Sequence, residues 1–238
     1  MKNIIVSTVI IFLTVSLSSC WERGPTQITM TTNKSDSLVI LLNGSWGTAT
    51  IDWGDGTTIK SRKYGILGTD FSHNYLDTSS HTITVTGSRL IAVQRLCCFE
   101  NQLTSLDVSK NPNLESLTLT GNQLTNLDVS KNLELTLLDC SFNQLTSLDV
   151  SNNTALWSLS CDDNLLTSLD VSNNTELMSL FLRHNQLSAL ALDALFETLH
   201  NNKLAFRNIY IGGNPGADSC NHSIATKKGW IVNIEKYR

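Results

Sequence analysis

The sequence has few charges and no excess of basic ones. Charged residues make up 16% of the 238 residues, and 17 lysines and arginines against 21 acidic residues give a formal net charge of −4. This balance excludes a basic surface that tracks phosphates, so we expect no nucleic-acid partner. The hydrophobic content of 41% is too high for a disordered chain. The length allows one or two folded domains.

The motifs of several common sites are also missing. The six cysteines and five histidines form neither a Cys-x-x-Cys pair nor the cysteine–histidine spacing that is typical of zinc. No glycine-rich phosphate loop or other cofactor motif occurs. We therefore expect no metal, no cofactor and no catalytic residues, and a protein that is not an enzyme.

The first twenty residues have the pattern of an export signal. One positive charge precedes Ile4–Leu17, an uncharged and mostly apolar run that is too short to span a bilayer comfortably. The cysteine directly after Ser18-Ser19 resembles the lipobox of bacterial lipoproteins, which implies that Cys20 becomes the lipidated N-terminus. We expect a signal peptide over 1–19, a tether over 20–27, and an exported protein anchored by its lipid to a bacterial membrane, at the outer membrane or the cell surface. An ordinary secretory signal with an incidental cysteine is the alternative.

Residues 28–88 carry strand and turn patterns without a helical period. Leu38–Leu42 is a run typical of a buried strand, Thr48–Trp53 and His81–Thr86 alternate apolar and polar residues, and Asp55-Gly56 favours a hairpin turn. Several short strands of this kind predict a small β-sandwich.

Three segments of this stretch carry a family pattern: Ile51-Asp-Trp-Gly-Asp-Gly-Thr57, Phe71–Tyr75 and Thr82–Gly87. They resemble the polycystic-kidney-disease (PKD) domain, an immunoglobulin-like β-sandwich. The resemblance implies structural roles, with Trp53 in the core, Asp55 in a turn, and His73 and Tyr75 in packing. The first strand of that family has no clear counterpart in this sequence.

Leucine is concentrated in one part of the chain. Of the 36 leucines, 29 lie between Leu90 and Asn214. The segment Leu-Thr-Ser/Asn-Leu-Asp-Val-Ser recurs there every 21 residues, starting at Leu103, Leu124, Leu145 and Leu166, and degenerates at Leu187. A fixed period of this length indicates stacked units that bury their apolar faces against one another. The pattern resembles the leucine-rich repeat (LRR) of internalin-like proteins.

We therefore expect a mixed fold with three parts. A PKD-like sandwich over 28–88 precedes an LRR solenoid with short parallel strands over 89–214, and a C-terminal cap follows over 215–238. The helical spacing of apolar residues after Leu187 predicts a helix over 193–201, and the cap is expected to hold a short helix over 218–228 and a closing strand.

Each repeat assigns its side chains to columns. Alternation along a strand points Leu117 and Leu119 inward, and Cys98, Cys140 and Cys161 fill equivalent inward positions as free thiols. An asparagine ends each strand, where its amide can bond the backbone of the turn and of the next coil. This structural ladder comprises Asn101, Asn122, Asn143, Asn164, Asn185 and Asn214.

A second column is acidic, which makes it a candidate calcium site. Asp107, Asp128, Asp149 and Asp170 occupy the same position of successive repeats. We favour a structural role, in which each carboxylate bonds its own Ser-x-Asn turn, over a metal site.

The outward strand positions form the concave face, where the sequence varies most. Aromatic and arginine side chains are the usual anchors of an interface, and Asp162 is expected beside Arg183. The candidate ligand-binding residues are Asp139, Phe142, Asp162, Phe181, Arg183 and Tyr210. Ser141, Asp163 and His184 also come close, but they lie on a flat sheet without an oxyanion donor, so a hydrolase is not favoured.

These features predict a non-catalytic, monomeric cell-surface lipoprotein. Its concave face is expected to bind a protein partner, in the manner of adhesins and internalin-like proteins. The alternative is a surface scaffold or carbohydrate-binding protein in which the PKD-like domain makes the contact with a glycan. A solubilising face without any ligand also remains open.

Overall fold

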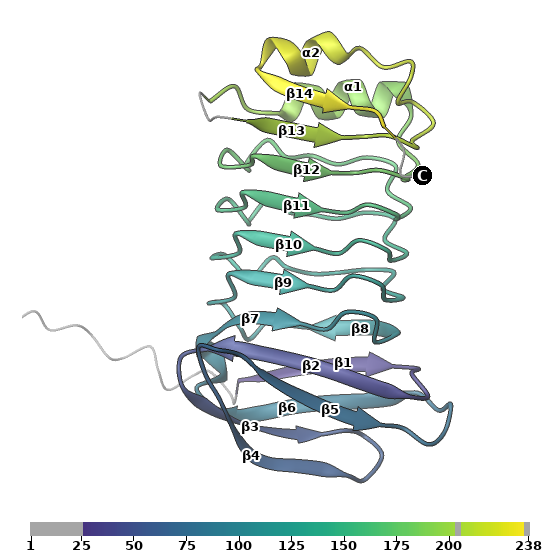
Figure 1. The fold of residues 1–238 in the computed structure, drawn as a ribbon. Coiled ribbons are helices and arrows are strands. Elements are labelled where there is room, and N and C mark those ends of the chain that lie inside the picture. The colour runs from purple at the N-terminus through teal and green to yellow at the C-terminus, as the bar shows by residue number, and fades with distance from the viewer. Residues whose placement is uncertain (1–25, 203–205, 236–238) are drawn as a thin grey trace, which may run out of the picture.

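The computed structural model describes residues 26–202 and 206–235 (Figure 1). They form one stack, with two β-sheets packed at the N-terminal end, single coils in the middle, and two helices and a strand at the C-terminal end. A single apolar core runs through the stack from Ile28 to Trp230.

Six strands build the N-terminal part. They are β1 Gln27–Thr32, β2 Ser37–Gly44, β3 Gly47–Asp52, β4 Thr58–Tyr64, β5 Thr69–Asn74 and β6 His81–Ser88. The sequence left the first strand unplaced. The structure places it as β1, which runs antiparallel to β6 with Gln27 opposite Thr86. The strand begins at Gln27, the last residue of the predicted tether.

The β3–β4 hairpin is held by side chains of the segment that resembles the PKD family. The carboxylate of Asp55 accepts from the backbone N–H of Thr57 at 2.9 Å and lies 2.6 Å from Nε2 of His73. The ring of His73 stacks on Trp53 with 5.0 Å between centroids, and the Tyr75 hydroxyl donates to the carbonyl of Trp53 at 2.7 Å. Burial acts to raise the pKa of Asp55, but the hydrogen bonds from Thr57 and the contact with His73 outweigh it and lower this pKa well below its usual range. These side chains therefore fix the hairpin.

The middle of the molecule is a stack of coils that each contribute one short strand to the same sheet. These strands are β7 Val93–Cys97, β9 Ser116–Thr118, β10 Leu137–Asp139, β11 Ser158–Ser160 and β12 Ser179–Phe181. They pair in parallel, with Leu117, Leu138, Leu159 and Leu180 in register across the coils. All four leucines are fully buried. The prediction of short parallel strands with inward leucines is confirmed.

The sandwich and the solenoid share both of their sheets. One sheet has nine strands in the order β14-β13-β12-β11-β10-β9-β7-β2-β5, and the other has five in the order β4-β3-β6-β1-β8. Strand β2 pairs antiparallel with β7, and β8 Leu103–Asp107 pairs antiparallel with β1. The first coil thus continues both sheets of the sandwich, which covers the N-terminal end of the solenoid (Figure 1).

The asparagines that end the strands tie each coil to the one before it. The amide nitrogen of Asn143 donates to the carbonyls of Leu119 and Cys140 at 3.0 Å each, and its Oδ1 accepts from the N–H of Leu124 at 3.0 Å. Asn101 makes the equivalent bonds to the sandwich, where its side chain both donates to and accepts from the backbone of Val39. The same set of bonds therefore joins coil to coil and solenoid to sandwich.

A second file of buried asparagines, one in each successive coil, was not predicted from the sequence. Its members belong to the Ser-x-Asn turns on the opposite side of each coil. Asn153 donates through Nδ2 to the carbonyls of Val129 at 3.0 Å and Asn132 at 2.9 Å, both in the preceding coil. The members are Asn111, Asn132, Asn153 and Asn174, all essentially inaccessible to solvent. The signal was present, because these asparagines recur every 21 residues.

The neighbouring aspartates each bond within their own turn. Asp107, Asp128, Asp149 and Asp170 accept from the backbone N–H of the serine two residues later at 2.8–2.9 Å. Hydrogen bonds from Ser109 lower the pKa of Asp107. The contacts are those of a turn-forming side chain.

The C-terminal cap differs in its boundaries from the prediction. Helix α1 spans Ala189–Thr198, four residues earlier than expected, because the Ser188 hydroxyl caps it by accepting from the N–H of Ala191. Strand β13, Arg207–Tyr210, follows. Helix α2, His222–Lys227, is shorter than expected, since residues 215–220 form turns. Strand β14, Trp230–Asn233, pairs in parallel with β13 and extends the nine-stranded sheet.

The second asparagine file yields a stability prediction. Replacing Asn153 by Ala removes two buried hydrogen bonds, each with a net contribution of about 0.5–1.5 kcal/mol, while the carbonyls of Val129 and Asn132 keep their backbone N–H donors. We expect the midpoint of urea unfolding, followed by circular dichroism, to fall markedly. Asn152→Ala is the matched control because the adjacent Asn152 is exposed, and it should leave the midpoint within error. Equal effects of the two substitutions would contradict this role.

Candidate binding face

The outward side of the nine-stranded sheet, here called the strand face, is longer than the repeats. Strand register connects the outward positions of the repeats to β5 and β2 at one end and to β14 at the other. One continuous row comprises Asp70, Leu41, Cys97, Thr118, Asp139, Ser160, Phe181, Tyr210 and Asn233. A ligand on this face could therefore contact the sandwich and the repeats together.

Two aromatic rings stack near the C-terminal end of the strand face. Phe181 and Tyr210 lie on neighbouring strands, with 4.7 Å between ring centroids and 5° between ring planes. The guanidinium carbon of Arg183 lies 4.3 Å from the centroid of Tyr210. Such a cation–π contact orients the guanidinium and covers part of the ring. Both aromatic side chains are half-buried, so each still offers surface to a ligand.

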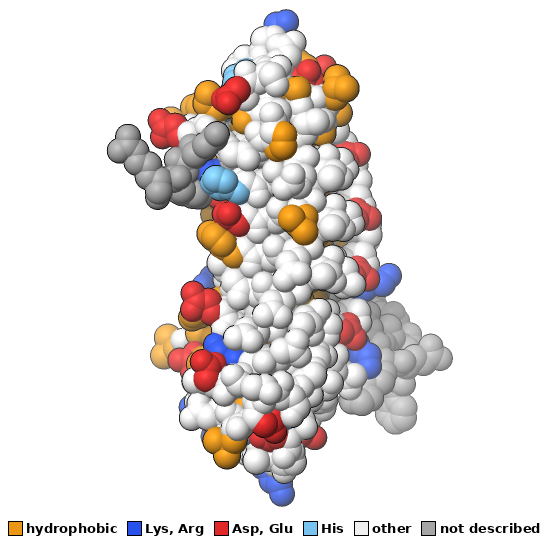
Figure 2. All heavy atoms as spheres, turned by 90° about the vertical axis from the view of Figure 1, so that its right-hand side faces the viewer, with side chains coloured by type: hydrophobic (Ala, Val, Ile, Leu, Met, Phe, Trp, Pro, Cys, Tyr) orange, Lys and Arg blue, Asp and Glu red, His pale blue; other side chains and the backbone are white. Residues whose placement is uncertain are grey.

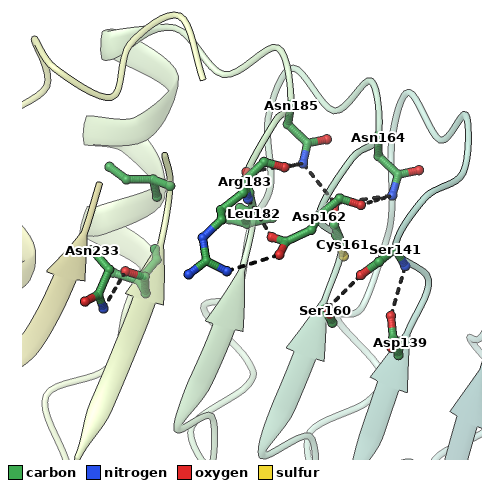
Figure 3. A network of polar contacts seen from close by, with 12 residues as sticks. Asp139, Ser141, Ser160, Cys161, Asp162, Asn164, Leu182, Arg183, Asn185 and Asn233 are labelled. Carbon is green, nitrogen blue, oxygen red and sulfur yellow. Dashed lines mark hydrogen bonds and ion pairs between the residues drawn. The ribbon is translucent and has the colours of Figure 1, made fainter. Parts of the chain in front are cut away.

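Asp162 and Arg183 lie together, but both are withdrawn from solvent. The Asp162 carboxylate accepts from the backbone N–H of Arg183 at 2.6 Å and from its guanidinium at 3.4 Å (Figure 3). Their residue exposures are only 4% and 8%. A buried pair of this kind positions its neighbours more than it contacts a partner, so its main role on this face is to hold Arg183 against Tyr210.

The polar side chains of the next two coils are also engaged with one another. The Asp139 carboxylate accepts from the backbone N–H of Ser141 at 3.0 Å, and the hydroxyls of Ser141 and Ser160 lie 2.7 Å apart (Figure 3). Asp139 keeps part of its surface open to solvent, whereas Ser141 is buried. A buried hydroxyl that is hydrogen-bonded to another serine lacks the arrangement of an activated nucleophile.

The last outward position of each coil has a left-handed backbone. The column contains Glu100, Gly121, Phe142, Asp163, His184 and Gly213, with φ between 52° and 81°. Two of the six are glycine, the residue that adopts this conformation without strain. Phe142 is the bulkiest member, and 54% of its surface is exposed. Glu100, Asp163 and His184 adopt the same conformation, so Phe142 differs from them in offering a large apolar side chain that the fold does not bury.

The column lies where the strands end, on the side of the molecule that Figure 2 faces. Most of that surface is white, the colour of the backbone and of side chains that are neither charged nor hydrophobic, and the coloured side chains form small separate groups. An exposed aromatic residue is therefore distinctive in this setting.

Four exposed aromatic residues of the described part were not among the sequence candidates: Trp46, Phe99, Trp157 and Phe206. Trp157 lies directly before β11 and is 46% exposed, while Phe99 follows β7 and is 54% exposed. Alternation along the chain places Phe99 outward, after the inward Cys98, but nothing in the sequence distinguishes it from its neighbours. Trp157 breaks its own column, where Thr136 and Met178 stand in the adjacent coils, and that irregularity was the available signal.

The described cysteines carry free thiols: Cys97, Cys98, Cys140, Cys161 and Cys220. Cys140 and Cys161 are buried in adjacent coils with 3.5 Å between their sulfur atoms. Within residues 26–202 and 206–235, no group of three His, Cys, Asp or Glu side chains could hold a metal ion. No helix of this described part is long and apolar enough to cross a membrane. Cys20 lies outside the described residues.

The in-register coils with their inward leucines form the solenoid that the leucine-rich pattern predicts, and several solved structures are similar to part of this chain. No family model matches the sequence, and no curated protein is significantly similar to it. An internalin (inlF) from Listeria monocytogenes is 22% identical over 55% of this chain and 37% of its own, with a TM-score of 0.45. The LRR protein LIC12759 of Leptospira interrogans is 25% identical over 45% of this chain and 27% of its own, with a TM-score of 0.37.

A plant protein is also among the similar solved structures. The BIR2 ectodomain from Arabidopsis thaliana is 20% identical over 51% of this chain and 69% of its own, with a TM-score of 0.39. This chain spans less than two thirds of the length of the two bacterial proteins. The likeness is one of fold, and the function has to follow from the side chains of this chain.

The left-handed column predicts an unusual effect of glycine. Phe142→Gly should leave the free energy of unfolding unchanged or raise it by up to about 1 kcal/mol, because it relieves strain and removes a largely exposed side chain. Thr120→Gly is the control at a position with an ordinary backbone, where glycine should cost about 0.5–1 kcal/mol. Urea unfolding of both variants measures the difference. A clear loss of stability in Phe142→Gly would refute the strain.

Proposed function

We propose that this protein is a non-catalytic, lipid-anchored protein of the bacterial surface that binds a protein partner through its strand face. Phe142 carries the proposal. It is an exposed aromatic side chain held at a left-handed position where two other coils have glycine. A residue that costs stability and offers apolar surface is best explained by a contact with another molecule.

The surroundings of Phe142 support a protein as the partner. Phe181, Tyr210 and Trp157 add aromatic surface on neighbouring coils. Aromatic residues dominate the energetics of protein interfaces, and arginine is enriched there too. The buried Asp162–Arg183 pair keeps this surface rigid, which reduces the entropy lost on binding.

The location is proposed from the sequence alone. The apolar run before Cys20 and the lipobox-like Ser-Ser-Cys favour export and lipidation. The PKD-like strands contribute β2 and β5 to the strand face, so we assign the sandwich a part in the same contact as the repeats. We propose no separate glycan site.

The binding proposal is tested with matched pairs of substitutions. Full-length protein in detergent is incubated with labelled surface proteins of cells, the captured protein is identified, and its dissociation constant is measured. Phe142→Gly with Phe181→Ala should weaken binding at least about 30-fold, the equivalent of one hot-spot residue worth about 2 kcal/mol. Leu76→Ala with Leu190→Ala is the control, because both leucines are exposed elsewhere.

Two results would contradict the proposal. The first is unchanged affinity of the strand-face pair for the captured protein. The second is retention of surface polysaccharide but of no protein, which would instead support the carbohydrate-binding alternative.

The anchor is tested separately. Cys20→Ala should abolish the incorporation of radiolabelled palmitate and release the protein from the membrane fraction, because the proposed acylation needs the thiol of Cys20. Cys97→Ala is the control, since it removes a thiol that lies in the folded part. Incorporation of palmitate into the Cys20→Ala protein would contradict lipidation at Cys20.

A further inference from the structure

A pocket opens on the strand face where the sandwich meets the first coil. Its volume is about 310 Å³, within the range of pockets that hold small molecules or single side chains. Residues of β2 and β5 line it from the sandwich, and residues of β7 and the turn after it line it from the solenoid. The pocket exists only because β2 pairs with β7, with Leu41 opposite Cys97.

The floor of this junction pocket is apolar and only partly covered. Val39 and Leu41 point away from the core, because the alternate residues of β2 are the buried ones, and both side chains remain half-exposed. Phe99 stands beside them with 54% of its surface exposed. A flat aromatic side chain next to two aliphatic ones offers a surface on which a planar group can stack.

The charges around the pocket favour a cation. Asp70 and Glu100 bring two carboxylates to its lining, and Lys34 brings one ammonium group. That ammonium lies 3.7 Å from the carboxylate of Asp36 and donates to the carbonyl of Glu100. The lining therefore carries two carboxylates and one ammonium group that already has Asp36 as its acidic neighbour, so the local charge is negative.

We propose that the junction pocket receives an arginine side chain of the protein partner. The guanidinium would stack on Phe99 and bond the carboxylate of Asp70 or Glu100, with its aliphatic stem on Val39 and Leu41. Two cation–π contacts of this kind already occur within the molecule. The guanidinium carbon of Arg62 lies 5.2 Å from the ring centroid of Phe71, and that of Arg183 lies 4.3 Å from the ring centroid of Tyr210. This inference deepens the proposed function, because it names what the partner presents at the N-terminal end of the strand face.

The thiol of Cys97 can report whether the junction pocket is occupied. Cys97 lines the pocket as a half-buried free thiol, whereas Cys220 is a half-buried free thiol in the C-terminal cap. Burial raises the pKa of both thiols, so both react slowly with an alkylating agent and can be compared in one sample. The remaining described cysteines are buried.

The test measures protection of Cys97 by a short peptide. Full-length protein is alkylated with iodoacetamide in the presence of acetyl-Gly-Arg-Gly-amide, or of the same peptide with citrulline, which has the shape of arginine without its charge. We expect the arginine peptide to slow alkylation of Cys97 but not of Cys220, as read by peptide mass spectrometry. The citrulline peptide should protect neither thiol.

Two substitutions assign the contacts. Phe99→Ala and Asp70→Asn should each raise the peptide concentration needed for half-protection about threefold to tenfold, in line with a partly exposed cation–π contact or ion pair. Both side chains are exposed, so the fold should be unaffected. Leu190→Ala is the control, because this exposed leucine lies in α1 and does not line the pocket, and it should leave protection of Cys97 unchanged.

Three results would overturn the inference: no protection by the arginine peptide, equal protection by the citrulline peptide, or equal protection of Cys97 and Cys220. None of them bears on the loss of partner binding through Phe142 and Phe181. The failure of the junction pocket is therefore distinguishable from the failure of the proposed function.

Discussion

Every coil of this protein depends on its neighbour for both its core and its hydrogen bonds. A coil of 21 residues is too thin to cover its own leucines, so Leu117 and Leu138 are buried only because the coils stack in register. The same stacking leaves backbone groups in the interior, where water cannot reach them, and an unpaired buried group is costly. Two files of asparagines bond these groups: Asn143 on one side of a coil both donates to and accepts from the backbone, and Asn153 on the other side donates to it. This dependence also explains the closed ends, since an uncovered coil would expose both its leucines and its strand edge.

The closure at the N-terminal end also extends the strand face. Because β2 pairs with β7, the sandwich both covers the first coil and extends the sheet. Its side chains Val39 and Leu41 therefore join the strand face beside Phe99. The face then has two distinct regions, an apolar pocket with a negative rim at one end and the stacked pair of Phe181 and Tyr210 at the other. A partner that spans both would be fixed in direction as well as in position.

Periodicity made most of the fold predictable, because a fixed repeat imposes the same environment on equivalent residues. It fails wherever the period breaks. Helix α1 begins at Ala189 and not at Asp193, since the cap is set by the Ser188 hydroxyl, which a search for apolar spacing does not weigh. For the candidate site, the assignment of side chains to columns predicted that Asp162 lies beside Arg183, and the two are in contact. It did not predict how deeply they are buried, because burial depends on how the side chains of two adjacent coils pack against one another.

By itself, the sequence determined the register of the solenoid: which residues face inward, which asparagines end the strands, and which outward columns vary. These follow from spacing alone, since the distance between coils is constant. Only the tertiary structure decided which outward residues remain available. It buried Asp162 and Arg183 and left Phe142 exposed in a left-handed conformation. It also created the junction pocket, because Leu41 and Cys97 are 56 positions apart in the chain and meet only through strand pairing.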